Sequence, residues 1–235
     1  MSTDKNKEKC DKLLKHIFGS NFYFIHSTIK LKSILKSGKI KISTKVKNED
    51  RSFSYIPNMT EDEEASIPPY AYCIALYDDV RLYMKDNISP HDLLIDPRIL
   101  LHENVIFNSG WFKEPINSND ENDEIFSIYL NKTDSKSERL EKLTKIKNFI
   151  DKKISLFPYN DEHISYSTHE FLFTKNIDLK KYLIGIVVSS KFFTIKSNKP
   201  KMSILNLIKK KYNGVKIYEK DKNDGKYPTL MEVIC

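Results

Sequence analysis

Glycine and cysteine are scarce in this chain, and each shortage excludes a class of site. Only 6 glycines occur in 235 residues, and neither GxGxxG nor a Walker A sequence is present. The common glycine-rich phosphate-binding loops are therefore excluded. The 3 cysteines, Cys10, Cys73 and Cys235, are odd in number and widely spaced. They predict free thiols in a reducing compartment rather than a disulfide framework or a CxxC zinc site.

Long apolar runs are also missing. No uninterrupted apolar stretch is long enough to span a bilayer, and the opening MSTDKNKEKC lacks the apolar core of a secretory signal. A hydrophobic content of 40% with 30% charged residues is typical of a soluble globular protein. We expect an intracellular protein, cytoplasmic or nuclear, that is not secreted and does not bind membranes.

The charge balance is basic, and lysine supplies nearly all of it. Lys and Arg total 39 against 32 Asp and Glu, a formal net charge of +7. Lysine is a hydrated point charge that suits phosphate contact better than bidentate base reading. Local clusters occur at 152–153 and 209–211. Two interpretations stay open, a lysine-rich solvated surface and attraction to a polyanion, above all nucleic acid.

The pattern of apolar residues predicts a single α+β domain over 1–235, because no Gly/Ser linker divides the chain. We expect an N-terminal helix within 1–20 and long polar loops at 44–69 and 110–135. Apolar runs predict strands at 22–26, 40–42, 70–77, 93–95, 105–107, 170–173, 184–188, 215–217 and 230–234. Helical spacing predicts helices at 29–36, 137–154 and 202–212, and a short one at 78–86.

The segment 22–43 (FYFIHSTIKLKSILKSGKIKIS) carries the first candidate site. An apolar strand ends on His26, Ser27 and Thr28 follow as candidate helix caps, and the short helix stops at Gly38. Hydroxyls and backbone N–H groups at a helix start can hold a phosphate or ribose oxygen. A histidine that ends a strand is equally typical of a satisfied structural residue.

Glu170 is the second candidate, because it leads the apolar run 171–173. A carboxylate in a hydrophobic strand must be hydrated, paired or functional, since an unpaired buried charge costs several kcal/mol. A solvent-facing glutamate at the strand's start is the alternative. The sequence HEFLF begins like HExxH but has Phe173 where the second histidine is required, so a zinc site of that type is excluded.

The order FIHST, LKSILKSG, an aromatic strand and then HEFLF resembles the ADP-ribosyltransferase-like fold. It is most similar to the branch with a His-Tyr-Glu triad and to the DarT-like members. The resemblance covers 22–43 and 168–174. It implies an α+β fold of two packed, mainly antiparallel sheets with peripheral helices. It also implies that NAD is bound as a substrate in the cleft between the sheets, with no metal.

The resemblance also implies roles for individual residues. Glu170 would be the catalytic glutamate, and His26 would bind the NAD ribose beside Ser27 and Thr28. A tyrosine stacked on the nicotinamide would be Tyr70, Tyr72 or Tyr77, and aromatic residues in such a strand are equally typical of a core. Arg51 would lie near the NAD phosphates, although the DarT-like pattern is absent beyond it. We expect His26 and Glu170 to converge on one cleft.

The function implied is NAD-dependent transfer of ADP-ribose to a nucleic-acid or protein acceptor. Cleavage of the nicotinamide–ribose bond builds positive charge on the ribose, which a carboxylate stabilises. The alternative is a non-catalytic module of the same fold that binds nucleic acid or a partner protein through its basic surface.

Overall fold

The computed structural model describes residues 2–19, 22–28, 30–42, 70–76, 91–109, 126–156, 170–189, 198–220 and 231–232. Its helices are α1 (Ser2–Phe18), α2 (Leu31–Ser37), α4 (Ile99–His102), α5 (Lys136–Leu156), α6 (Leu179–Tyr182) and α8 (Asn198–Lys211). Its strands are β1 (Tyr23–Thr28), β2 (Lys39–Ile40), β3 (Ala71–Leu76), β4 (His91–Ile95), β5 (Val105–Asn108), β6 (Ser127–Leu130), β7 (Glu170–Phe173), β8 (Ile177–Asp178), β9 (Leu183–Ser189), β10 (Lys216–Lys220) and β11 (Met231–Glu232).

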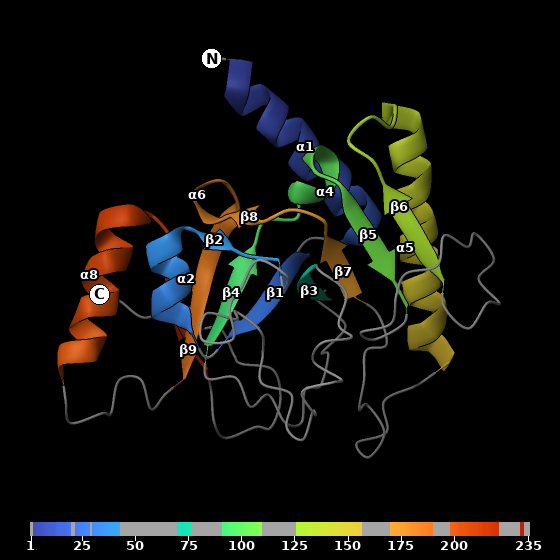
Figure 1. Ribbon diagram of the computed structural model, residues 1–235. Coiled ribbons are helices and arrows are strands. Elements are labelled where there is room, and N and C mark those ends of the chain that lie inside the picture. Colours follow the sequence, from blue (N-terminus) through green and yellow to red (C-terminus); the bar gives the residue numbers. More distant parts are fainter. Residues whose placement is uncertain are drawn as a thin grey trace.

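The strands form one nine-stranded sheet and a separate two-stranded sheet (Figure 1). The strand order in the large sheet is β11-β10-β9-β4-β1-β3-β7-β5-β6, and β2 pairs with β8. Among these ladders only β9 and β10 run parallel. The predicted α+β class with mainly antiparallel strands is confirmed. The two halves of the large sheet meet at β3, which pairs with β1 on one side and with β7 on the other.

The large sheet has two chemically different faces. Side chains alternate between the faces of a strand, and paired residues share a face. The main hydrophobic cluster takes its strand residues from one set of alternating positions, which we call the core face. They include Phe24, Ala71, Cys73, Ala75, Leu93, Ile95, Val105, Phe107, Phe171, Phe173, Ile186 and Val188.

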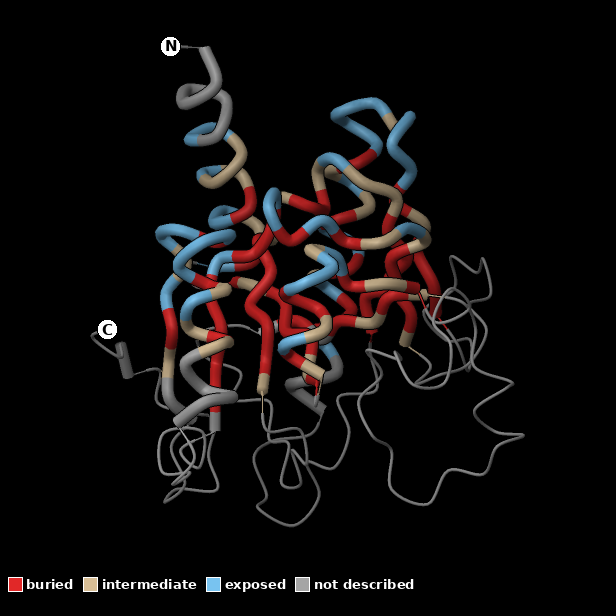
Figure 2. The backbone as a smooth tube through the Cα atoms, turned by 60° about the vertical axis from the view of Figure 1, so that its left-hand side comes forward, coloured by how far each residue is buried: buried red, intermediate tan, exposed pale blue. Residues whose placement is uncertain are grey.

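Helices and connecting segments supply much of the rest of that cluster. The ring of Phe24 contacts those of Phe171 and Phe173, with centroids 4.7 and 5.9 Å apart. Phe18 at the end of α1 stacks on Phe22, and Phe149 of α5 packs edge-on against Phe107. Figure 2 shows the strands running through the buried interior, with the exposed residues on turns and outer helix surfaces.

The opposite side, which we call the second face, carries apolar residues that are buried but lie outside the main cluster. These are Ile25, Leu94, Ile106, Leu172 and Val187. At one point the second face admits no side chain. A Cβ atom added to Gly185 would lie 2.9 Å from Leu94 Cδ1 and 2.9 Å from Tyr218 Cε2. Glycine is therefore required there by close packing.

The short helix α2 follows its sequence closely. Leu31, Ile34 and Leu35 are buried along one side, and Gly38 ends the helix in the left-handed conformation at φ 73°. The Gly38 N–H donates to the Ile34 carbonyl, which satisfies one of the last helical acceptors. The expected helix caps are not formed: the N-cap is Lys30, with no side-chain cap. The reason is that β1 continues through Thr28, so α2 begins only at Leu31.

Most predicted elements appear near their expected positions, and four short ones were missed: α4, β6, β8 and α6. The strand β6 (Ser127–Leu130) lies inside the range 110–135 that the sequence predicts as a loop. The predicted loop 44–69 and the predicted helix 78–86 lie outside the described residues. Of the helices that the structure describes, none is both long and apolar enough to cross a membrane.

Candidate functional site

The strands β1 and β3 pair over only part of their length. Their register runs from Tyr23↔Leu76 to Ile25↔Ile74. Beyond that point, in the described strands, β1 pairs with β4 alone and the residues 71–73 of β3 pair with β7 alone. We call this divergence the fork. Where two strands diverge, the backbone N–H and C=O groups along their facing edges no longer bond to each other. These groups can then form hydrogen bonds with side chains, with other segments or with a ligand.

His26 is the first residue of β1 beyond the fork, and it bridges it. Its side chain is buried, and its Nδ1 atom lies 2.8 Å from the carbonyl oxygen of Tyr72 on β3. A carbonyl only accepts hydrogen bonds, so Nδ1 carries the proton and donates. The imidazole therefore ties together two strands that no longer pair through their backbones.

Ser27 and Asp92 form a second polar pair on register partners of β1 and β4. The hydroxyl of Ser27 donates to Oδ1 of Asp92 at 2.5 Å. Asp92 is only 1% exposed, whereas Ser27 is half-buried. Because the Ser27 proton is committed to the carboxylate, the remaining lone pairs of its oxygen can accept from a ligand.

Glu170 opens β7 as a buried carboxylate, 4% exposed. It is the register partner of Asn108 on β5, whose Oδ1 accepts from Ser127 Oγ at 2.8 Å. Asn108 and Ser127 are both fully buried. The solvent-facing alternative for Glu170 is therefore wrong, and the carboxylate lies in a polar row on three neighbouring strands.

Strand alternation decides which of these side chains share a face. Ser27 and Asp92 on one side of the fork, and Tyr72 and Glu170 on the other, belong to the second face. Ser27, Tyr72 and Glu170, three of the predicted site residues, thus share one face of three adjacent strands.

His26 belongs to the core face, because it follows Phe24 by two residues. The register places His26 and Glu170 within one residue of the same level, about 10 Å apart across β3 by the usual strand spacing. The two segments are therefore brought together, as the sequence predicts. Alternation does not support convergence of the two side chains on one cleft, which stays a prediction.

The other predicted residues have different settings. Thr28 is fully buried, and its hydroxyl accepts from the Lys30 N–H at 2.9 Å. Tyr70 and Tyr72 are half-buried, with their rings edge-to-face at 6.3 Å between centroids. Arg51 and Tyr77 lie outside the described residues.

Asp92, Asn108 and Ser127 were missed by sequence reasoning. Asp92 stands inside the apolar run HDLLI, where it is the same kind of signal as Glu170 in HEFLF. Asn108 and Ser127 end and begin strands, where polar residues are common, so only the pairing of β5 with β6 reveals them.

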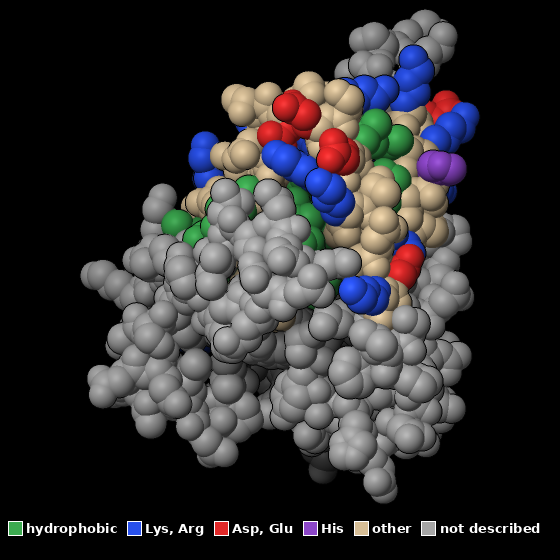
Figure 3. Space-filling model, turned by 90° about the vertical axis from the view of Figure 1, so that its right-hand side faces the viewer, with side chains coloured by type: hydrophobic (Ala, Val, Ile, Leu, Met, Phe, Trp, Pro, Cys, Tyr) green, Lys and Arg blue, Asp and Glu red, His purple; other side chains and the backbone are tan. Residues whose placement is uncertain are grey.

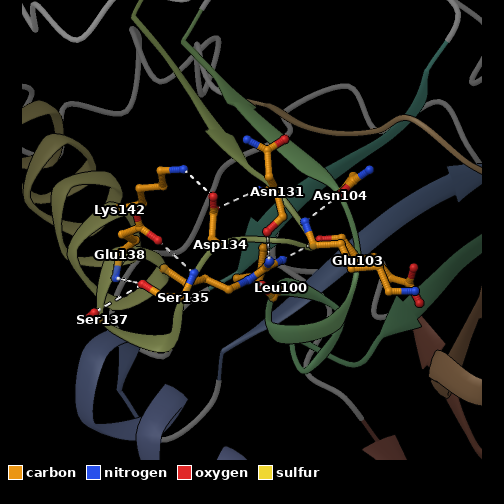
Figure 4. A network of polar contacts seen from close by, with 11 residues as sticks. Leu100, Glu103, Asn104, Asn131, Asp134, Ser135, Ser137, Glu138 and Lys142 are labelled. Atoms are coloured by element: carbon orange, nitrogen blue, oxygen red, sulfur yellow. Dashed lines mark hydrogen bonds and ion pairs between the residues drawn. The ribbon is translucent and has the colours of Figure 1, made fainter.

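A separate polar network lies at the other end of β5 and β6 (Figure 4). The buried guanidinium of Arg139 donates to the backbone carbonyls of Leu100, Glu103 and Asn131, and burial lowers the pKa of Arg139. Ser135 and Glu138 form a reciprocal capping box at the start of α5. This network joins α4, β6 and α5, and we assign it a structural role.

The free cysteines and possible metal ligands add no second site. Cys73 is on the core face, and burial raises the pKa of its thiol. Among the residues that the structure describes, no group of three or more His, Cys, Asp or Glu side chains could hold a metal ion.

Comparisons with known proteins complete the description. The structure is similar to that of DarT from Thermus sp. 2.9 in complex with ADP-ribosylated single-stranded DNA, with 15% identity and a TM-score of 0.46. The similarity covers 88% of this chain and 96% of that one. No curated protein matches the sequence. A family model described as a family of unknown function, DUF5846, matches residues 20–153. This is more than half of the chain, so the protein belongs to that family.

Proposed function

We propose that this protein is an NAD-dependent ADP-ribosyltransferase that acts on a nucleic-acid or protein acceptor. The observation that carries the proposal is the setting of Glu170. It is a buried carboxylate at the level of the fork, on the same sheet face as Ser27 and Tyr72. A carboxylate, a hydroxyl and an aromatic ring, beside two backbone edges that no longer pair with each other, form a polar site in the sheet.

In the proposed reaction, the protein contributes mainly electrostatic stabilisation of the transition state. The bond between ribose C1′ and the nicotinamide nitrogen breaks, and its electron pair stays on the nicotinamide. Positive charge develops on the ribose, and the Glu170 carboxylate stabilises it without moving a proton. An acceptor oxygen or nitrogen then bonds to C1′ and loses its proton to solvent or to a nearby base.

The remaining groups would bind and orient NAD. Tyr72 supplies the ring for stacking on nicotinamide, and Ser27 offers an acceptor oxygen fixed by Asp92. His26 acts on the site through the Tyr72 carbonyl, so we propose it as a positioning residue. We also propose that Thr28 contacts the ribose and that Arg51 lies near the phosphates. Tyr77 is the alternative to Tyr72 for stacking on the nicotinamide.

Glu170→Gln tests the proposal, because the amide keeps the volume and removes the charge. We expect release of nicotinamide from NAD to fall on the order of a hundredfold or more, while thermal stabilisation by NAD is retained. Glu141→Gln is the control, since that carboxylate is exposed on α5 and pairs with Lys145 on the same helix. Full turnover by Glu170→Gln would overturn the assignment.

The second candidate is a non-catalytic binding module of the same fold. It predicts no nicotinamide release from NAD by the wild-type protein under any acceptor condition. Absence of any thermal shift at millimolar NAD would favour this candidate.

A further inference from the structure

The helices α2 and α8, distant in sequence, lie side by side (Figure 1), and lysines are the charged residues of both. The Tyr212 hydroxyl, just beyond α8, donates to the Leu35 carbonyl of α2 at 2.8 Å. Lys211 Nζ donates to the Lys36 carbonyl at 2.7 Å. These bonds fix α2 against the end of α8, so their outer surfaces form one continuous area.

The two helices carry lysines and no carboxylates. The sequence has no Asp or Glu at 12–48 or 179–218, which include all of α2 and α8. Five lysines of the two helices are exposed, and we call them the α2–α8 lysines: Lys32, Lys36, Lys209, Lys210 and Lys211. Within the part of the chain that the structure describes, no carboxylate forms an ion pair with any of them.

The helix α5 is also rich in lysine but differs in arrangement. Lys145 pairs with Glu141, Lys147 with Asp151, and Lys142 with Asp134. Figure 3 shows the side of the molecule that bears α5, where basic and acidic side chains alternate. Three lysines of α5 therefore have a carboxylate partner, whereas none of the α2–α8 lysines has one among the described residues.

We propose that the α2–α8 lysines form a docking surface for the phosphate backbone of a nucleic acid. Lysines contact phosphates as point charges and do not read bases in the bidentate manner of arginine, so binding will be independent of sequence. This goes beyond the proposed function, because it places a binding surface outside the fork and does not require NAD.

The chemistry of the surface favours nucleic acid over a membrane. A helix that lies on a bilayer inserts its apolar side. Ile204 and Ile208 of α8 are buried instead in the core cluster, as are Ile34 and Leu35 of α2, and Leu205 and Leu207 of α8 are partly buried against it. No large apolar side chain described on α2 or α8 is exposed beside the lysines.

The test compares two triple variants of the full chain with equal net charge. The first carries Lys32→Gln, Lys36→Gln and Lys210→Gln, and leaves the Lys211 bond in place. The control carries Lys132→Gln, Lys136→Gln and Lys145→Gln, three exposed lysines on or beside α5. Each variant removes three charges from the net +7.

Binding of a fluorescein-labelled duplex oligonucleotide of mixed sequence is followed by anisotropy at several salt concentrations. For wild type we expect log affinity to fall linearly with log salt. The α2–α8 variant should bind more weakly, with a slope shallower by up to about 2.7, about 0.9 for each lysine that contacts a phosphate. The control should resemble wild type.

Several results would overturn the proposal. One is equal loss in the two triple variants, which would mean that only net charge matters. Another is absence of oligonucleotide binding by the wild-type protein. A third is binding to vesicles of phosphatidylserine and phosphatidylcholine that is as tight as binding to the oligonucleotide. Circular dichroism confirms that each variant is folded. If the wild-type protein binds the oligonucleotide but releases no nicotinamide from NAD, the proposed function is contradicted and the docking surface is not.

Discussion

The Nδ1 atom of His26 donates to the carbonyl oxygen of Tyr72 across the point where β1 and β3 stop pairing. A single side chain thus replaces the backbone bonds that the fork removes. The site side chains on the two arms of the fork, Ser27 and Tyr72, are held relative to each other partly by this imidazole.

His26→Ala should therefore affect both stability and ligand binding. We expect a loss of about 1–3 kcal/mol in the free energy of unfolding, because a buried carbonyl loses its donor and a cavity forms. Urea denaturation measures it. If His26 positions the fork, NAD binding weakens and the turnover of bound NAD changes less. A drop in turnover as large as that of Glu170→Gln would instead show His26 to be catalytic.

Arg139 should be one of the least replaceable residues of the fold. Its guanidinium satisfies three backbone carbonyls from separate segments, and it is 5% exposed. Arg139→Lys keeps the charge but loses the planar fork of donors, so we expect a loss of about 2–4 kcal/mol in unfolding free energy. Lys145→Gln, which removes only an exposed pair on the same helix, should cost about 0–1 kcal/mol. Similar losses for both would contradict this role.

The pKa of Tyr182 gives a prediction for alkaline pH. Burial, with the hydrogen bond to Glu103, raises the pKa of Tyr182 to about 12. The folded state then keeps a proton that the unfolded chain releases near its ordinary pKa of about 10. Stability contributed by this group is present below about pH 10 and falls as the pH rises toward 12.

Tyr182→Phe isolates that contribution, since phenylalanine has no proton to lose. At neutral pH the variant should be less stable by about 1 kcal/mol through the lost hydrogen bond. Between pH 9 and 11.5 its urea midpoint should fall less steeply than that of wild type. Parallel pH profiles for the two proteins would show that Tyr182 does not titrate differently on unfolding.

The local elements could be predicted from the sequence, because their signals are local. The run 22–26, the helix that stops at Gly38 and the strand led by Glu170 all appear as β1, α2 and β7. The strand β6 was missed because it has only 4 residues and follows a long polar segment that reads as a loop.

The composition of the site could be predicted only in part, since it depends on register between distant strands. The sequence predicted His26, Ser27 and Thr28 together as binding residues and could not separate the face of Ser27 from that of His26 and Thr28. Which of two neighbours faces a site is decided by strand alternation, and a shift of one residue reverses it. Asp92 was missed for the same reason, as its partnership with Ser27 links strands 65 residues apart.

The Ser27–Asp92 pair gives a prediction that separates folding from ligand binding. Ser27→Ala removes a donor from a carboxylate that is 1% exposed, and we expect a loss of about 1.5–3 kcal/mol in unfolding free energy. In the double variant Ser27→Ala with Asp92→Ala the carboxylate is gone as well. Changes in unfolding free energy are not additive for residues in contact, so the double variant should lose less than the sum of the single losses.

Thermal stabilisation by NAD should be reduced in both proteins that lack the Ser27 hydroxyl, whatever their stability. Additive losses in urea would mean that the two side chains do not act as a unit. A normal NAD shift in Ser27→Ala would remove the hydroxyl from the proposed site and leave Glu170 and Tyr72 as its polar and aromatic components.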